Sequence, residues 1–126
     1  MTAVDDLWYL ATEARQQAEQ VYHRLADDHE DYLEFTTTRR VSRSRFRTVA
    51  SRIERQGLPY GAHTLAYRPS GELLLVKQAA IDTWVLPGGE VEPDERLLEG
   101  ARRELHEEAG IDVDYDGLGI LGEVRF

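Results

Sequence analysis

With 126 residues and no cysteine, the chain is long enough to bury the core of one domain with an appendage, and both a disulfide framework and a thiolate metal site are excluded. Its formal net charge of −9 argues against a general nucleic-acid binder, because phosphate contacts need a basic surface. No apolar run could cross a membrane, and the first residues lack the basic flank of a signal peptide, so we expect a cytoplasmic protein.

The charges alternate along the chain. Residues 1–35 carry nine acids and two bases, residues 36–55 carry seven arginines and one acid, and residues 56–126 carry fourteen acids and six bases. Lys77 is the one lysine among fifteen basic residues. Many carboxylates with almost no lysine are typical of halophilic proteins, in which salt screens self-repulsion. A GC-rich genome favours arginine as well.

The first 56 residues predict a helical hairpin ahead of the main domain. Small and apolar residues recur at spacings of three and four, which predicts a helix over about residues 6–26. The acidic stretch 27–34 is expected to be a loop or a helix edge. A second helix is predicted over about 42–55, because a glycine and a proline follow it.

Beyond the second expected helix the periodicity becomes extended. Residues 62–67 and 72–77 favour strands and flank a Pro-Ser-Gly turn, which predicts a hairpin. The apolar run 84–86 stops at Pro87-Gly88-Gly89, and a last strand is expected over 117–126.

One helix, predicted over about 94–109 with Gly110 as a left-handed C-cap, carries the residues that point to chemistry. The arc expected to pack on the sheet contains Leu97, Leu98, Ala101 and Leu105. The arc expected to face water contains Arg96, Glu99, Arg102 and His106. A single ridge at the margin of the core contains Glu104, Glu107 and Glu108.

The three glutamates of this ridge predict a metal ion. Like charges at these spacings repel one another, and the helix macrodipole disfavours anions near a C-terminus, so the arrangement requires a cation. Carboxylates without a clustered histidine or cysteine favour Mg²⁺ or Mn²⁺ over zinc.

A longer spaced set contains this ridge. Its members are Gly89, Glu95, Arg103, Glu104, Leu105, Glu107, Glu108, Gly110 and Ile111. They match without departure the Nudix box, which runs G, five residues, E, seven residues, R-E-aliphatic-x-E-E-x-G-aliphatic. Seven fixed identities bring a chance match well below roughly one in a million. The chain therefore resembles the Nudix hydrolase (MutT-like) family, and the Trp-x-Leu-Pro-Gly-Gly lead-in is similar too.

The resemblance implies an α/β (α+β) fold, the Nudix α/β/α sandwich, over residues 57–126, after an N-terminal helical region over 1–56. It also implies an enzyme that uses Mg²⁺ or Mn²⁺ to hydrolyse a pyrophosphate bond, with water attacking phosphorus. Nudix domains continue with further strands and a second helix, which we expect this domain to lack. Either the chain is a fragment or a neighbouring chain completes the sheet, as in a homodimer.

The resemblance assigns roles residue by residue. Glu107 and Glu108 would ligate the metal, with the Gly88 carbonyl as a further ligand, and Glu104 would be a ligand or the base that orients water. Arg103 would hold a glutamate in place, and Glu95 would anchor the helix start or act as an outer-shell metal partner. The residues expected to bind substrate are Gly88, Gly89, Arg68 and Lys77.

The predicted substrate class rests on the order of two elements along the chain. A helical extension followed by the strand 73–78 resembles the Nudix members that act on nucleoside diphosphates linked to X, which makes ADP-ribose the first substrate guess. The rival function is a non-catalytic nucleotide-binding or regulatory module with an arginine-rich nucleic-acid contact. The intact glutamate set favours the enzyme.

Two other features of the sequence, the arginine-rich stretch and Trp84, each allow two interpretations. The arginine-rich stretch 39–55 would recognise RNA or substrate phosphates, or would pair with acidic residues 27–34 or the acidic hydrolase surface, and we favour the pairing. Trp84 is expected in the core rather than as a base-stacking platform. His63 and His106 are expected to have no catalytic role.

Overall fold

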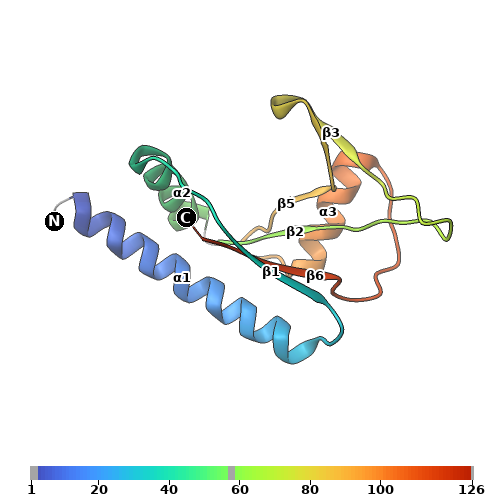
Figure 1. Ribbon diagram of the computed structural model, residues 1–126, viewed down its shortest axis with the longest axis horizontal. Helices are drawn as coiled ribbons and strands as arrows, with labels where there is room; N and C mark the ends of the chain where they lie inside the picture. The colour runs from blue at the N-terminus through green and yellow to red at the C-terminus, as the bar shows by residue number, and fades with distance from the viewer. Residues whose placement is uncertain (1–2, 57–58, 126) are drawn as a thin grey trace. The chain divides into compact units, whose positions relative to one another are not determined.

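The computed structural model describes the backbone of residues 3–56 and 59–125 and the side chains of residues 8–51 and 59–125 (Figure 1). The chain forms two compact units, Met1–Pro59 with Asp116–Phe126, and Tyr60–Tyr115. The described residues contain three α-helices and three two-stranded sheets, which confirms the α+β class. No described helix is both long and apolar enough to cross a bilayer.

Two helices of the first unit pack against each other. Helix α1 spans Ala3–Asp28 and helix α2 spans Arg43–Gln56, as their periodicity predicted. The Ser42 hydroxyl accepts a hydrogen bond from the Arg45 amide at 3.1 Å, as an N-cap residue does. Ala50 of α2 is buried, and Phe46 and Val49 are half-buried.

A strand runs between these helices, so the prediction of a helical hairpin over the first 56 residues was wrong. Strand β1, Leu33–Thr38, pairs in parallel with β6, Ile120–Arg125, from Leu33 opposite Ile120 to Thr38 opposite Arg125. The expected loop at 27–34 therefore ends in a strand. The partner strand lies near the other end of the sequence, and no local pattern announces such a pairing.

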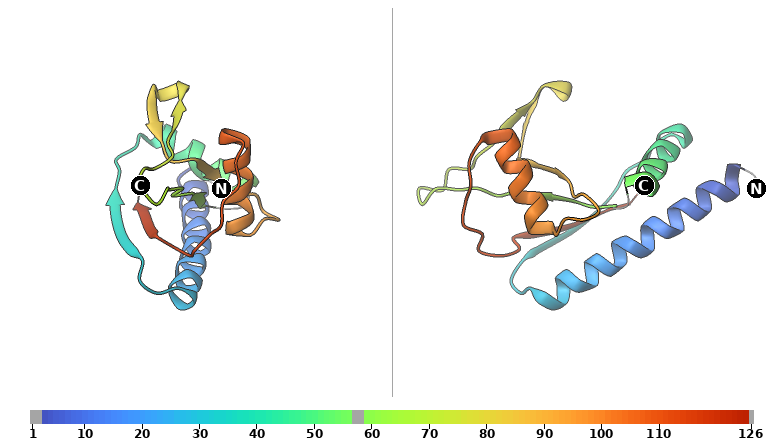
Figure 2. Two further views of the ribbon diagram at one scale, coloured as in Figure 1. Left: turned by 90° about the vertical axis from the view of Figure 1, so that its right-hand side faces the viewer. Right: turned by 180° about the vertical axis from the view of Figure 1, so that it is seen from behind.

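The second unit begins with short antiparallel pairs. Strand β2, Gly61–His63, pairs with β5, Gly88–Glu90, and β3, Val76–Gln78, pairs with β4, Thr83–Val85. The 3₁₀ turn η1, Ala79–Ile81, links β3 to β4. Figure 2 shows the β3–β4 hairpin projecting beyond the rest of this unit.

The expected hairpin over 62–77 forms with less regular pairing than predicted. Its turn is closed by the Gly71 amide, which donates to the Arg68 carbonyl at 2.8 Å, and Tyr67 pairs with Leu73 in an isolated bridge. Trp84 is 62% exposed, so the expectation that it lies in the core was wrong. Its strand belongs to a two-stranded sheet, which leaves its side chain without a second layer to cover it.

Helix α3, Leu97–Ala109, packs against β2 and β5. Gly110 follows with φ +68° and its amide donates to the His106 carbonyl at 2.9 Å, which confirms the left-handed C-cap. Leu105 and Ala101 are buried, but Leu98 is 46% exposed, contrary to the helical-wheel expectation. The arc predicted to face water is exposed. Helix α3 thus presents one narrow buried face to the strands.

Candidate active site

The site is built where β5 runs along α3. Gly88 has φ +153°, and a Cβ there would overlap the Ala62 carbonyl and the backbone of His63. A Cβ on Gly89 would lie 3.0 Å from the Glu104 carboxylate. The two glycines therefore let the β5 backbone pair with β2 on one side and lie against an acidic side chain of α3 on the other.

Arg103 joins several of the acidic groups. Its Nε donates to Glu95 Oε2 at 2.7 Å and its Nη2 donates to Glu95 Oε1 at 3.0 Å, a two-point contact that only a guanidinium can make. Nη1 donates to Glu104 at 3.0 Å and to Glu107 at 3.3 and 3.5 Å. Nη2 also donates to the Glu90 carbonyl at 3.1 Å. One cation thus ties α3 to β5 and to the loop between them.

The ion pair between Arg103 and Glu95 shifts the pKa of both partners. Hydrogen bonds from Arg103, and then from the Glu92 amide, hold the pKa of Glu95 below its ordinary value. Glu95 in turn raises the pKa of Arg103 above its already high value, although burial works against this. Each partner thus favours the charged form of the other.

Gly100 makes this contact possible, although it was not among the predicted site residues. A Cβ at this buried position would lie 3.1 Å from Val91 Cγ2 and 3.3 Å from Glu95 Oε1. A glycine inside a helical pattern was the available signal, because it marks close packing. Glu90 and Glu92 were missed as well, and no pattern of the sequence singles them out.

The three glutamates of the ridge differ in environment. The Glu104 side chain is 17% exposed and that of Glu107 is 57% exposed. Glu108 is also exposed, and its Oε2 accepts a hydrogen bond from the Gly88 amide at 3.3 Å. The ridge therefore runs from a largely buried carboxylate beside Gly89 to open carboxylates at the end of the helix.

Arg68 and Lys77 were expected to bind substrate, but no described contact joins either of them to the glutamate ridge. Arg68 lies 3.8 Å from Glu72 within its own turn, and Lys77 pairs with Asp82 at 3.0 Å in the β3–β4 hairpin. His63 lies beside Gly88, and His106 is exposed on α3.

The donor set suits a hard divalent cation by its chemistry. Glu104, Glu107 and Glu108 supply carboxylate oxygens, and the adjoining β5 backbone supplies carbonyls, which are the ligands that Mg²⁺ prefers. Within residues 8–51 and 59–125, no three acidic or histidine side chains are arranged as a metal-binding group. The positive charge between Glu104 and Glu107 comes from Arg103.

Comparison with known proteins finds a matching family model and several similar proteins. The family model described as the NUDIX domain matches residues 57–126, more than half of the chain. A protein of Bacillus subtilis (strain 168) named "Putative 8-oxo-dGTP diphosphatase" is 44% identical over 67 residues, which are 52% of this chain and 45% of that protein.

Two further relatives have other names. The "MutT-like protein" of Streptomyces ambofaciens is 47% identical over 51 residues, 40% of this chain and 33% of its own. The "m7GpppN-mRNA hydrolase NUDT17" of Danio rerio is 33% identical over 89 residues, 67% of this chain and 30% of its own. The chain thus spans less than half the length of the relatives it matches. No solved structure matches it.

Proposed function

The chain belongs to the NUDIX domain family, and from this premise we propose that it hydrolyses the pyrophosphate bond of a nucleoside diphosphate linked to another group, with ADP-ribose as the first substrate to test. The observation that carries the proposal is the glutamate ridge of α3, anchored by Arg103 and lying against the side-chain-free backbone of Gly88 and Gly89. A diphosphate can approach such a backbone closely.

The chain's own residues have distinct tasks in this reaction. Glu107 and Glu108, with the Gly88 carbonyl, would hold Mg²⁺, and Glu104 either joins them or accepts the proton of the attacking water at a carboxylate oxygen. When bound, the ion neutralises phosphoryl oxygens and lowers the pKa of water. Arg103 uses every guanidinium nitrogen on protein groups, so it is a positioning residue rather than a substrate ligand.

The relatives' names widen the set of substrates to test. They refer to 8-oxo-dGTP and to the m7GpppN cap of mRNA, and these compounds carry the same kind of phosphoanhydride. The substrate screen therefore contains ADP-ribose, CDP-choline, 8-oxo-dGTP and a cap analogue, each with and without Mg²⁺. Release of a phosphomonoester, followed by mass spectrometry, identifies both the substrate and the bond that breaks.

The first mutational prediction concerns Glu108. Glu108→Gln removes one anionic oxygen of the ridge without changing its size, and we expect kcat to fall on the order of 10²-fold or more. Glu99→Gln is the matched control, because Glu99 lies on the arc of α3 that faces water and touches Arg96 alone among the described ion pairs. Equal turnover in both variants would assign the activity to a contaminant.

A non-catalytic nucleotide-binding module is the second candidate function. It predicts that nucleotides bind, as calorimetry would measure, while no phosphomonoester appears with any substrate or metal. Turnover that Glu108→Gln abolishes and Glu99→Gln preserves would exclude it.

A further inference from the structure

The basic segment, which we define as residues 36–51, differs in chemistry from the rest of this acidic chain. It contains five arginines and seven serine or threonine residues, and none of the chain's 24 acidic residues. Residues 36–38 end β1 and residues 43–51 begin α2, so the segment joins two elements of one unit. Its composition reverses the charge of its surroundings over a short length of chain.

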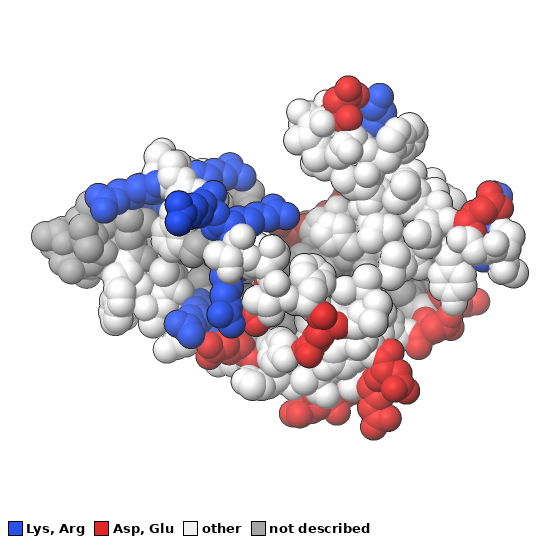
Figure 3. Space-filling model, viewed as in Figure 1, with Lys and Arg blue, Asp and Glu red and all other residues white. Residues whose placement is uncertain are grey.

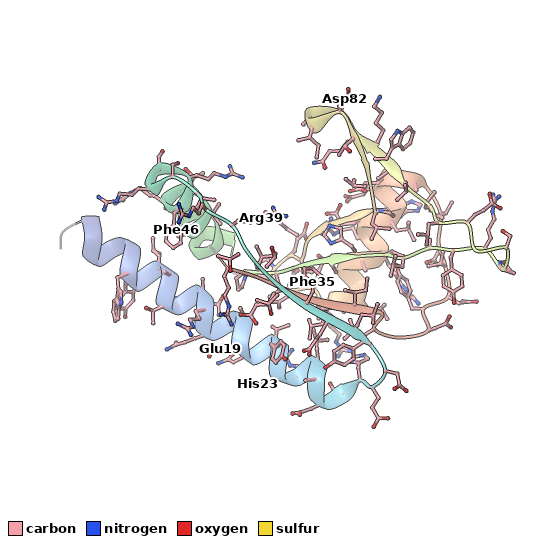
Figure 4. All side chains as sticks on the ribbon, viewed as in Figure 1. Glu19, His23, Phe35, Arg39, Phe46 and Asp82 are labelled. Atoms are coloured by element: carbon pink, nitrogen blue, oxygen red, sulfur yellow. The ribbon has the colours of Figure 1, made fainter. Side chains whose placement is uncertain are left out.

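The arginines of the basic segment face outward. All five are exposed: Arg39, Arg40, Arg43, Arg45 and Arg47. Phe46 of α2 is half-buried and Ala50 is buried, and this helix contacts α1. Figure 3 shows basic side chains gathered over α2, and Figure 4 marks Arg39 beyond β1 and Phe46 on the helix. The segment therefore exposes its guanidinium groups to solvent and does not bury them in ion pairs.

Four of these arginines have no acidic partner within the described residues. Among the described residues, the guanidinium groups of Arg39, Arg40, Arg43 and Arg45 make no ion pair and donate no hydrogen bond. Arginines elsewhere do pair, for example Arg15 with Glu19 and Arg125 with Glu123. The pairing expected between the arginine-rich stretch and residues 27–34 is thus not seen for these four side chains.

Concentrated positive charge of this kind is unfavourable without an anion. The first turn of α2 contains no acidic residue, and the positive end of the helix dipole adds to the repulsion. Arg39, Arg40, Arg43 and Arg45 lie within seven consecutive residues, so their charges are close together along the chain. A nucleic acid strand carries phosphates at a comparable density, about one per 3.4 Å in a duplex strand. Carboxylates of a folded protein repel one another at that density.

The residue types favour phosphate over carboxylate as the partner group. Arginine and hydroxyl side chains make most protein contacts to the phosphodiester backbone. The one aromatic residue of the basic segment, Phe46, is half-buried, so the segment offers no platform on which bases could stack. Contacts confined to the backbone predict binding that does not depend on base sequence.

We propose that the basic segment binds the phosphodiester backbone of a nucleic acid strand, through Arg39, Arg40, Arg43 and Arg45. The overall charge of −9 limits this binding to a local surface and to moderate salt. The proposal does not depend on the hydrolase activity, because the basic segment and the glutamate ridge belong to different compact units.

Fluorescence anisotropy of the full chain with labelled 20-nucleotide RNA and DNA strands of several sequences tests the proposal. Four phosphate contacts predict that log K falls against log salt with a slope of about −2.8, at about −0.7 per contact. Arg39→Gln with Arg40→Gln, and Arg43→Gln with Arg45→Gln, should each weaken binding at least tenfold at low salt. Each pair should also reduce the size of the slope by about 1.4.

The matched control is Arg15→Gln with Arg24→Gln, which removes the same charge from α1 in the same unit. Circular dichroism of every variant checks that the helices remain. Binding that is weakened only in the basic-segment variants supports the proposal. Comparing the RNA strands with the DNA strands shows which nucleic acid supplies the phosphates. Absent or salt-independent binding, equal loss in the control, or equal affinity for polyglutamate would overturn it.

Discussion

At the scale of single residues, Arg103 decides how the glutamates of α3 are held. All of its guanidinium nitrogens donate hydrogen bonds, and their partners lie on β5, in the following loop and on the helix itself. A lysine in this place would keep the charge but lose the planar fork. The geometry of this contact, rather than its charge alone, therefore sets the positions of Glu95 and Glu104.

Arg103→Lys tests this role. We expect a lower melting temperature and, on a substrate from the screen, a fall in kcat/KM on the order of 10²-fold, because small displacements of catalytic groups have effects of that size. Arg96→Lys on the same helix is the control, since Arg96 is 91% exposed and 3.9 Å from its nearest acid. Arg103→Lys with both properties of the unchanged protein would contradict the role of the fork.

At the scale of elements, α3 ends where its C-cap requires glycine. Gly110 lies in the left-handed region, and a Cβ there would meet nothing within 4 Å. Because the helix ends at this point, the glutamate ridge lies in its last two turns. Because the position is sterically open, a substitution there measures only the energetic cost of the left-handed backbone conformation.

Gly110→Ala should lower the free energy of unfolding by about 1–2 kcal/mol, the cost of holding an L-residue in the left-handed region. Gly110→Asn should lower it less, since asparagine adopts this conformation more readily. Urea denaturation followed by circular dichroism measures both. An alanine variant as stable as the parent, or less destabilised than the asparagine variant, would show that the cap does not have this effect.

At the scale of the whole molecule, charge is distributed along the chain in alternating blocks. The described cations outside the basic segment include several that pair with nearby acids, while the chain as a whole keeps a net charge of −9. Self-repulsion of this size is long-range at low ionic strength and is screened at high ionic strength. Added salt should therefore raise the stability of the fold and weaken the binding of anions by the basic segment.

The melting temperature should rise with KCl between about 0.1 and 1 M, as the Debye length falls from about 10 to about 3 Å. A gain of about 1 kcal/mol corresponds to a rise of roughly 4 °C for a domain of this size. A sucrose series separates screening from solvent exclusion, which also stabilises proteins. A flat or falling melting temperature in KCl would refute the halophilic interpretation of the composition.

The same titration bears on the nucleic-acid proposal. Binding by the basic segment should weaken several hundredfold between about 0.1 and 1 M salt, from the predicted slope of about −2.8. A protein that is most stable at molar salt would then use this surface only at lower salt. Measuring stability and binding in one salt series shows whether the two ranges overlap.

Features that depend on neighbours along the chain could be predicted from the amino-acid sequence. Helical spacing identified α1, α2 and α3, the glycine after α3 identified its C-cap, and the spacing from Gly89 to Ile111 identified the glutamate ridge. These features could be predicted because helices and caps are made by residues three to five positions apart.

Contacts between distant segments became known only from the three-dimensional fold. It paired β1 with β6 from opposite ends of the chain, left Trp84 exposed, and placed Gly100 against Glu95. Strand pairing and burial depend on partners brought from elsewhere, and the sequence around a residue does not contain them. For the same reason spacing predicted the ridge, whereas only the fold revealed that Arg103 also binds the Glu90 carbonyl.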